Sequence, residues 1–262
     1  MSPLARLVVL VAFSAVASIG CAPPYKVDPD AAPPPGPYPV NADPVEGEAG
    51  VFIDKVLRTE FSDHIDGHGI KRSVFRLGSG PVSMWVMSYY DPVRGKLVVW
   101  PSSLLRKNAV WVFELKEGLT GLEGNPVEPG IITSFRTGAE TGDNMPFPWT
   151  YYDNDVEHIF NARCASCHGG ASPIVGLSLE NVGGIWQTAV NVPADGWLGW
   201  DRIVPSRPGE SYLVYKIIGD RRIVGKQMPR ILMEGEQTQP LSQKEMETIS
   251  DWIASGTLLS TP

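Results

Sequence analysis

The sequence predicts two folded domains of different class, an all-β sandwich followed by an all-α domain, behind an N-terminal export segment. Stretches rich in β-branched and aromatic residues recur about every ten residues between Val51 and Thr137, a spacing typical of β-sandwiches. A helix with both ends marked lies near the end of the chain, from Ser242 to Gly256. The length of 262 residues also suits two modest domains and a tether better than one small domain.

The composition is that of a globular protein. Hydrophobic residues make up 43% of the chain and charged residues 19%, which argues against wholesale disorder and against a membrane bundle. The formal net charge is -7, and no stripe of Lys and Arg offers a surface to phosphate groups. We therefore expect no nucleic-acid partner.

Residues 1–20 are expected to be a signal peptide. Arg6 is the one charged residue among them, and the apolar run that follows, Leu7 to Ile19, is too short to span a bilayer comfortably. The run ends in Ala-Ser-Ile-Gly before Cys21, which resembles the lipobox of bacterial lipoproteins, although Ser18 stands where that family prefers Leu. The resemblance implies that Cys21 is lipidated, with ordinary signal cleavage nearby as the alternative.

The expected location follows from these features. Export and a lipid anchor place the protein in the bacterial cell envelope. Ala22 after the cysteine, in place of Asp, resembles an outer-membrane sorting signal and implies an outer-membrane lipoprotein facing the periplasm or the cell surface.

Residues 21–49 are predicted to be the lipidated cysteine and a Pro-rich tether. This segment contains Pro33-Pro34-Pro35-Gly36-Pro37 and almost no apolar periodicity. Such a segment buries too little apolar surface to fold and favours an extended conformation.

Residues 50–138 are predicted to form the sandwich. The alternation of Trp111, Phe113 and Leu115 with the residues between them is typical of a half-buried strand. The candidate strands are Val51–Phe61, Ser73–Leu77, Val82–Tyr89, Lys96–Trp100, Ala109–Leu115 and Ile131–Thr137.

This stretch resembles a family of bacterial Ig-like domains. The matching segments, in the order of the family, are Phe61–Asp66, Tyr90–Pro92, Lys96–Val99, Gly121–Pro126 and Ser134–Thr137. The resemblance implies a spacer or a protein-binding module without catalytic residues, and so a possible protein partner for this domain.

Residues 139–154 are polar and contain Pro, as expected of a linker, and residues 155–262 are predicted to form the second domain. Within it, Cys164-Ala165-Ser166-Cys167-His168 is a C-x-x-C-H motif, the pattern that attaches c-type haem. We expect a helix from Asp155 to run into the motif, because helical positions three and four apart share one face. Each thiol can then form a thioether with a haem vinyl group while neutral His168 ligates the iron.

Two other uses of the cysteine pair compete with haem. Structural zinc needs about four ligands, and after the motif no second cysteine pair or H-x-x-x-H cluster completes the set. A thioredoxin-like redox pair needs a βαβ frame, which the glycine-rich segments that follow do not supply. Export favours haem, because bacterial c-type haem is attached outside the cytoplasm.

Two further helices are predicted in this domain. One runs from Glu210 to Ile218. The last is capped by Ser242 and Glu245 and ends at Gly256, and we expect its Trp252 to pack near Phe160 on the first helix.

The second domain resembles small bacterial class I-like cytochrome c domains. The matching segments are Cys164–Gly170, Gly176–Leu179, Ile203–Pro205, Pro208–Ser211 and Asp251–Gly256. The resemblance implies an all-α cytochrome c domain with one covalent haem c. One departure is that the Pro whose carbonyl orients the haem histidine in many relatives has no clear counterpart, because Pro173 follows His168 too closely.

The resemblance also implies a distal methionine ligand to the haem iron. Met228, before Pro229, is the expected ligand, and Met233 is the alternative. Arg202 is a candidate contact for a haem propionate, since a guanidinium pairs well with a carboxylate; an exposed structural arginine is the competing interpretation.

With His168 and Met228 as axial ligands, no position on the iron is open to substrate, so we expect single-electron transfer with a redox protein partner and no catalysis. A peroxidase-type enzyme or gas binder is the alternative if Met228 is not a ligand. A third hypothesis is an Ig-like surface-binding or structural lipoprotein with accessory haem. The basic residues Lys216, Arg221, Arg222, Lys226 and Arg230 form either a docking rim or a solvated face.

Overall fold

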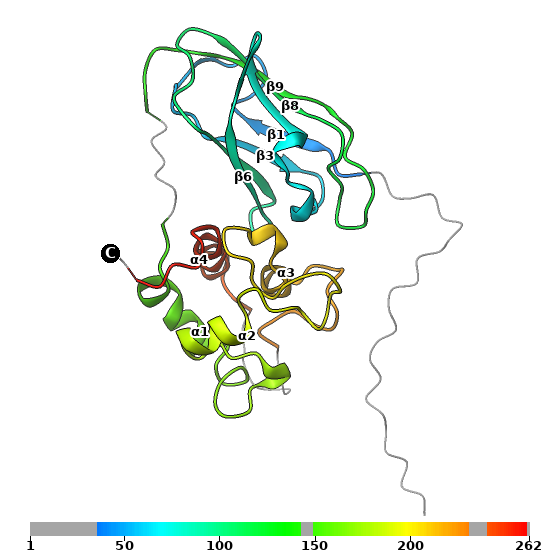
Figure 1. Ribbon diagram of the computed structural model, residues 1–262, viewed down its shortest axis with the longest axis vertical. Helices are drawn as coiled ribbons and strands as arrows, with labels where there is room; N and C mark the ends of the chain where they lie inside the picture. Colours follow the sequence, from blue (N-terminus) through cyan, green and yellow to red (C-terminus); the bar gives the residue numbers. More distant parts are fainter. Residues whose placement is uncertain (1–35, 143–148, 231–239, 261–262) are drawn as a thin grey trace, which may run out of the picture. The chain divides into compact units, whose positions relative to one another are not determined.

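The computed structural model describes residues 36–142, 149–230 and 240–260 (Figure 1). The predicted signal peptide, Cys21 and Met233 lie outside the described residues. The described residues belong to one compact unit, in which we call residues 36–142 the sheet region and residues 149–260 the C-terminal region. None of the helices in these ranges has the length and apolar character needed to cross a membrane.

Two sheets make up the sheet region (Figure 1). The first has the order β1-β3-β7-β6 and is antiparallel throughout, with β1 Pro39–Asp43, β3 Leu57–Phe61, β7 Lys96–Pro101 and β6 Val86–Asp91. The second has the order β2-β9-β8-β4-β5, with β2 Ala49–Val51, β9 Gly130–Thr137, β8 Val110–Leu115, β4 Phe75–Ser79 and β5 Val82–Met84. In this second sheet β2 pairs with β9 in parallel.

The two sheets share one hydrophobic core. Trp111, Phe113 and Leu115 of β8 and Leu97 and Val99 of β7 are buried in it. Because successive side chains of a strand point to opposite faces, every second residue of these strands contributes to the core. The alternation that the sequence displays in β8 therefore marks its buried face.

The strand boundaries differ from the expected ones at several places. The predicted strand Val51–Phe61 covers the end of β2 and all of β3, which belong to different sheets, and the predicted strand Ser73–Leu77 begins in a 3-10 turn and continues into β4. The predicted tether, 21–49, overlaps β1, whose backbone pairs with β3 from Asp43↔Arg58 onward. Polar, Pro-containing chain can serve as an edge strand because the neighbouring strand supplies the hydrogen bonds, and Pro is tolerated at the first position, here Pro39. The predicted strand Val82–Tyr89 is two strands in different sheets, separated at Trp85.

The helices are short (Figure 1). The α-helices are α1 Glu157–Arg163, α2 Val182–Thr188, α3 Tyr212–Ile218 and α4 Gln243–Ala254. A π-helical turn, Tyr152–Val156, precedes α1, and 3-10 turns occur at Gly67–Gly69, Arg72–Val74, Ile174–Gly176 and Pro208–Glu210.

The expected fold class, an all-β Ig-like sandwich followed by an all-α cytochrome c domain, is wrong. Of the described residues, 27% lie in strands and only 23% in helices, so the protein is mainly β with a few short helices. Isolated β-bridges such as Val190↔Ile203 and Asp201↔Ser211 connect the chain between α2 and α3. The physical reason is that this chain is rich in Gly and Pro, which interrupt helices, while helices of about two turns need tertiary packing to persist.

The predicted packing of the last helix is confirmed. Ser242 and Glu245 form the capping box at the start of α4. Trp252 of α4 meets Phe160 of α1 edge to face, with ring centroids 5.9 Å apart. Both side chains are buried in the second hydrophobic core, which positions the end of α1 and the motif that follows it.

Candidate functional site

The C-x-x-C-H motif lies in a turn directly after α1, not on the helix as expected. The last bond of the helix runs from the Cys164 N–H to the Phe160 carbonyl, 2.8 Å. The Cys164 carbonyl then accepts hydrogen bonds from the N–H groups of Cys167, at 3.1 Å, and His168, at 2.8 Å. The two cysteines and the histidine are therefore carried by this turn and not by a helix face.

The imidazole of His168 is held by a backbone carbonyl. Its Nδ1 lies 3.3 Å from the carbonyl oxygen of Ile174. A carbonyl oxygen only accepts hydrogen bonds, so Nδ1 must hold the proton and Nε2 of the neutral ring has a free lone pair. Burial lowers the pKa of His168, which favours this neutral form.

Ile174 is a site residue that sequence reasoning missed. Its N–H donates to the Cys167 carbonyl at 3.0 Å while its own carbonyl accepts from His168. The residue before it is Pro173, with φ -66° and ψ 143°. Pro173 thus lies directly before the residue whose carbonyl orients the ring. In the sequence, this proline was the feature that could have pointed to Ile174.

The two thiols are not joined to each other. Burial raises the pKa of the Cys164 thiol to about 12. Near neutral pH this sulfur is protonated, whereas metal ligation and thiol–disulfide exchange use the thiolate. Within the described ranges, no group of three or more His, Cys, Asp and Glu side chains is arranged to hold a metal ion.

The two glycines after the histidine suit the turn for different reasons. A Cβ on Gly169 would come within 2.5 Å of the Ala165 carbonyl oxygen. Gly170 has φ +71°, a conformation that side chains disfavour, and its N–H donates to Glu180 at 2.7 Å.

Apolar side chains project into solvent next to the motif. Ile174 and Val175 are 52% and 62% exposed. Val175 also has φ +52°, an outlier for a β-branched residue of the kind that clusters at ligand-binding sites. Large apolar side chains left exposed beside reactive groups are typical of a surface that a ligand covers.

Arg202 holds this exposed loop. Its guanidinium donates to the carbonyls of Val175, at 2.9 Å, Gly176, at 3.2 Å, and Thr188, at 2.8 Å, and forms an ion pair with Asp195 at 3.0 Å. These donors bind the loop after the motif, the end of α2 and Asp195, and the Arg202 side chain is only 13% exposed. Its contact with a haem propionate stays a prediction.

Met228 lies against α3. Its N–H donates to the Lys216 carbonyl at 2.9 Å, and the neighbouring Gln227 side chain donates to the Ile217 carbonyl at 2.8 Å. The side chain of Met228 is half-buried. Ligation of iron by Met228 stays a prediction.

Two arginines of the basic segment are engaged in ion pairs within the chain. Arg222 pairs with Asp63 of the sheet region at 3.0 Å and with Asp220 at 2.7 Å. Arg221 pairs with Asp63 at 3.1 Å and with Glu123. Both arginines therefore join the C-terminal region to the sheet region.

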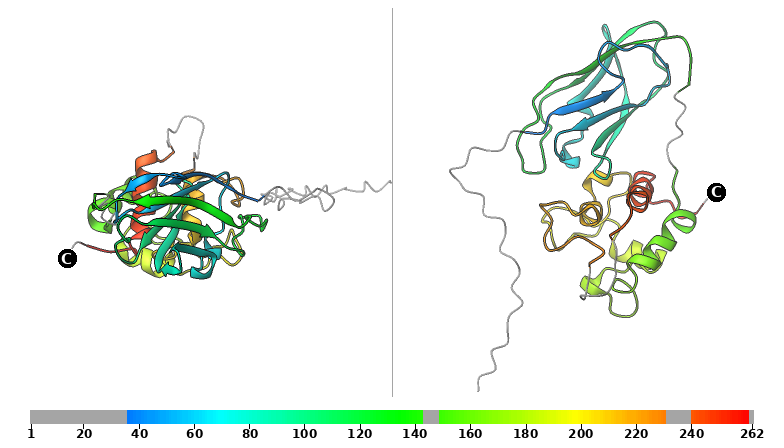
Figure 2. Two further views of the ribbon diagram at one scale, coloured as in Figure 1. Left: turned by 90° about the horizontal axis from the view of Figure 1, so that it is seen from above. Right: turned by 180° about the vertical axis from the view of Figure 1, so that it is seen from behind.

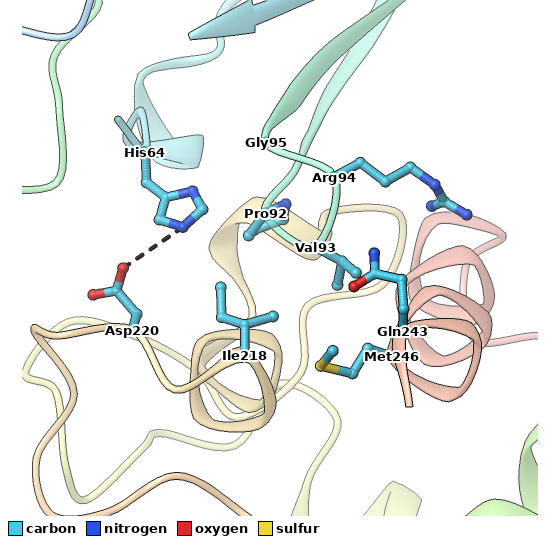
Figure 3. Close-up of a pocket in the computed structure, with 9 residues that line it drawn as sticks. All are labelled: His64, Pro92, Val93, Arg94, Gly95, Ile218, Asp220, Gln243 and Met246. Atoms are coloured by element: carbon cyan, nitrogen blue, oxygen red, sulfur yellow. Dashed lines mark ion pairs between the residues drawn. The ribbon is translucent and has the colours of Figure 1, made fainter. Parts of the chain in front are cut away.

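A pocket of about 400 Å³ lies where the two regions meet (Figure 3). Its lining residues are His64, Pro92, Val93, Arg94, Gly95, Ile218, Asp220, Gln243 and Met246. His64 Nδ1 is 2.6 Å from the Tyr90 hydroxyl, and its Nε2 is 3.7 Å from an Asp220 oxygen. Burial lowers the pKa of His64. The charges of Arg222 and Arg221 lower it further, whereas those of Asp220 and Asp63 raise it.

The polar groups of this pocket already have protein partners. Asp220 is bound by Arg222, Arg94 by Asp91 and Asp251, and Gln243 by Glu247. We therefore regard the pocket as part of the interface between the two regions. The candidate functional site is the C-x-x-C-H turn.

Comparison with known proteins assigns no family. No protein-family model and no curated protein matches the chain. Among solved structures, the N-terminal part of the bacterial S-layer protein SbsC matches 39% of this chain at 10% identity, with a TM-score of 0.32. CopC from Methylosinus trichosporium OB3b matches 39% at 12% identity, TM-score 0.29, and L,D-transpeptidase 1 of Mycobacterium tuberculosis matches 40% at 15%, TM-score 0.25. The matches span 93% of CopC but only 23% of the SbsC chain and 40% of the transpeptidase.

Proposed function

We propose that Cys164, Cys167 and His168 hold one covalent c-type haem and that the protein transfers single electrons in the bacterial cell envelope. The observation that supports this most directly is the hydrogen bond from His168 Nδ1 to the Ile174 carbonyl, which leaves Nε2 available to a metal. Metal-ligating histidines characteristically donate their other ring N–H to a carbonyl or carboxylate in this way.

The donor set fits haem c. Each thiol would add across one vinyl group, forming a carbon–sulfur bond while the thiol hydrogen goes to the adjacent carbon, so attachment needs no oxidant. His168 Nε2 would bind the iron. The bound haem would supply an iron centre that changes oxidation state by one electron.

The chain around the motif supports this use in three ways. The Ile174 carbonyl orients the imidazole and increases its basicity as a ligand. The exposed side chains of Ile174 and Val175 offer an apolar surface that a porphyrin would cover. Arg202 keeps the carbonyl ends of this loop in place.

We propose Met228 as the second axial ligand, which would leave the iron without an open position. The role is then outer-sphere electron transfer to a redox protein partner. The lipobox-like sequence that ends at Cys21 supports export and lipid anchoring, with the sheet region as a spacer or protein-binding module.

Covalent haem is tested by producing the exported protein together with the haem-attachment machinery and recording a pyridine haemochrome spectrum after denaturation. Wild type should retain one haem per chain, and Cys164→Ala/Cys167→Ala should retain none. A colourless wild-type protein, with its thiols free or joined to each other, would overturn the proposal.

The distal ligand is tested by carbon monoxide binding to the reduced native protein. Wild type and the control Met87→Ala, which changes an exposed methionine of the sheet region, should bind carbon monoxide slowly or not at all. Met228→Ala should bind it rapidly. Rapid binding by wild type would refute Met228 as ligand and favour a gas-binding or peroxidase-type role.

A further inference from the structure

The loop 194–200 presents a fully exposed leucine on a rigid base. Trp197 and Trp200 stack with ring centroids 4.7 Å apart. Their backbones are tied as well, because the Ala194 N–H donates to the Trp200 carbonyl at 2.8 Å and the Trp200 N–H to the Trp197 carbonyl at 3.1 Å. Between the two tryptophans, Leu198 is 100% exposed. A single exposed leucine is ordinary on a protein surface, so its neighbours decide whether it marks a contact surface.

A second loop, 223–226, lies beside the first (Figures 1 and 2, yellow and orange). Both loops meet at the hydroxyl of Tyr212. The Val224 N–H donates to this hydroxyl at 3.1 Å, and Gly196 lies so close that a Cβ there would come within 2.5 Å of it. Val224 is itself 62% exposed. We call loops 194–200 and 223–226 together the apolar tip.

Two lysines lie at the second loop of the apolar tip, although the chain has a net charge of -7. Lys226 is exposed in the second loop, and the Lys216 ammonium donates to the carbonyls of Val224 and Lys226. In the first loop, the exposed carboxylate of Asp195 is paired with Arg202 at 3.0 Å. Lys226 therefore faces solvent at the tip, while half-buried Lys216 holds its ammonium against the backbone of the second loop.

We propose that the apolar tip inserts Leu198 and Val224 into the interfacial layer of an anionic lipid bilayer, with Lys216 and Lys226 near the lipid phosphates. Two projecting side chains bury too little area for a stable protein–protein interface, which typically covers about 1,600 Å². A bilayer, in contrast, accepts an isolated apolar projection, and each lysine near an anionic surface adds to the attraction. The expected N-terminal anchor would keep the tip close to such a surface, and the insertion does not depend on haem.

The test uses the chain from Ala22 onward, which lacks any lipid but retains the compact unit. Co-sedimentation with vesicles of phosphatidylcholine and phosphatidylglycerol should show binding that falls with added salt. Leu198→Asp should weaken partitioning roughly tenfold or more, given the apolar area withdrawn from water by a buried leucine. Lys226→Gln should weaken it less, and only at low salt.

The matched control is Leu104→Asp, which places the same change at an exposed leucine of the sheet region and should bind like wild type. Thermal unfolding verifies that each variant is folded. Equal binding of wild type and Leu198→Asp would overturn the proposal, as would equal binding to vesicles of phosphatidylcholine alone. No binding to either kind of vesicle would also overturn it and would leave an acidic protein as the partner to seek.

Discussion

Arg94 connects the two regions through a cluster of carboxylates. Its guanidinium is 2.6 Å from Asp91, at the end of β6, and reaches both oxygens of Asp251 on α4, at 2.8 Å and 3.0 Å. Asp91 also accepts hydrogen bonds from Ser250 at 2.8 Å and from the Val93 N–H at 3.0 Å. These contacts predict that Arg94 contributes strongly to stability.

Arg94→Met retains the apolar stem and removes the charge. It leaves three carboxylates close together: Asp91 and Asp251, whose side chains are only 2% and 13% exposed, and Glu247, which lies 3.4 Å from Arg94 in the wild-type protein. Removing one partner of a buried ion pair costs about 3–5 kcal/mol. Because the Arg94 side chain is 29% exposed, solvent screens part of this, and we expect a loss of about 2–4 kcal/mol in the free energy of unfolding.

The loss should depend on pH in a defined direction. Burial raises the pKa of Asp251 in the wild-type protein, although Arg94 opposes the shift. Without Arg94 this pKa rises further. A carboxyl whose folded-state pKa is raised contributes stability at low pH that is lost as pH rises through that pKa. The defect of Arg94→Met should thus be larger at pH 7 than at pH 4.

Urea unfolding followed by tryptophan fluorescence and far-UV circular dichroism measures this loss. Arg106→Met, at an exposed arginine of the sheet region, is the control and should change stability by less than about 0.5 kcal/mol. Arg94→Met/Asp251→Asn should recover part of the loss, since one unpaired charge is removed. An Arg94→Met protein as stable as the control variant, or equally unstable at both pH values, would refute the reasoning.

Two further predictions concern the same joint. A Cβ on Gly67 would lie 2.3 Å from the Gly209 carbonyl oxygen, so Gly67→Ala should lower the free energy of unfolding in urea by about 1–3 kcal/mol or more. The control Gly130→Ala, with nothing within 4 Å of the added Cβ, should resemble wild type. Equal stabilities of the two variants would contradict the close backbone contact. Burial lowers the pKa of His64 below its ordinary 6.5, although Asp220 attracts the protonated form. The contribution of the neutral histidine to stability is therefore complete above the unfolded-state pKa and is lost as pH falls through the folded-state pKa. Thermal unfolding between pH 7 and pH 5 should therefore show a shallower loss for His64→Gln than for wild type, and parallel curves would rule out this role.

Local patterns in the sequence were sufficient for the features that depend on neighbours along the chain. The capping box at Ser242 and Glu245 needs only residues three apart, and the buried face of β8 follows from alternation. The fold class of the C-terminal region was not predictable in this way. Apolar segments such as 212–218 form helices of two turns, and whether the intervening chain is helical or irregular depends on packing with distant segments.

What the sequence by itself determined is the chemistry available at the candidate site: two thiols and an imidazole at C-x-x-C-H spacing, since this depends on side chains a few residues apart. Only the tertiary structure decided that Ile174 supplies the carbonyl that orients His168, that Arg202 holds the adjoining loop, and that Arg221 and Arg222 bind the sheet region. The physical reason is that a hydrogen bond or ion pair depends on distance in space, and bonds between residues tens of positions apart form only once the folded backbone has brought them together.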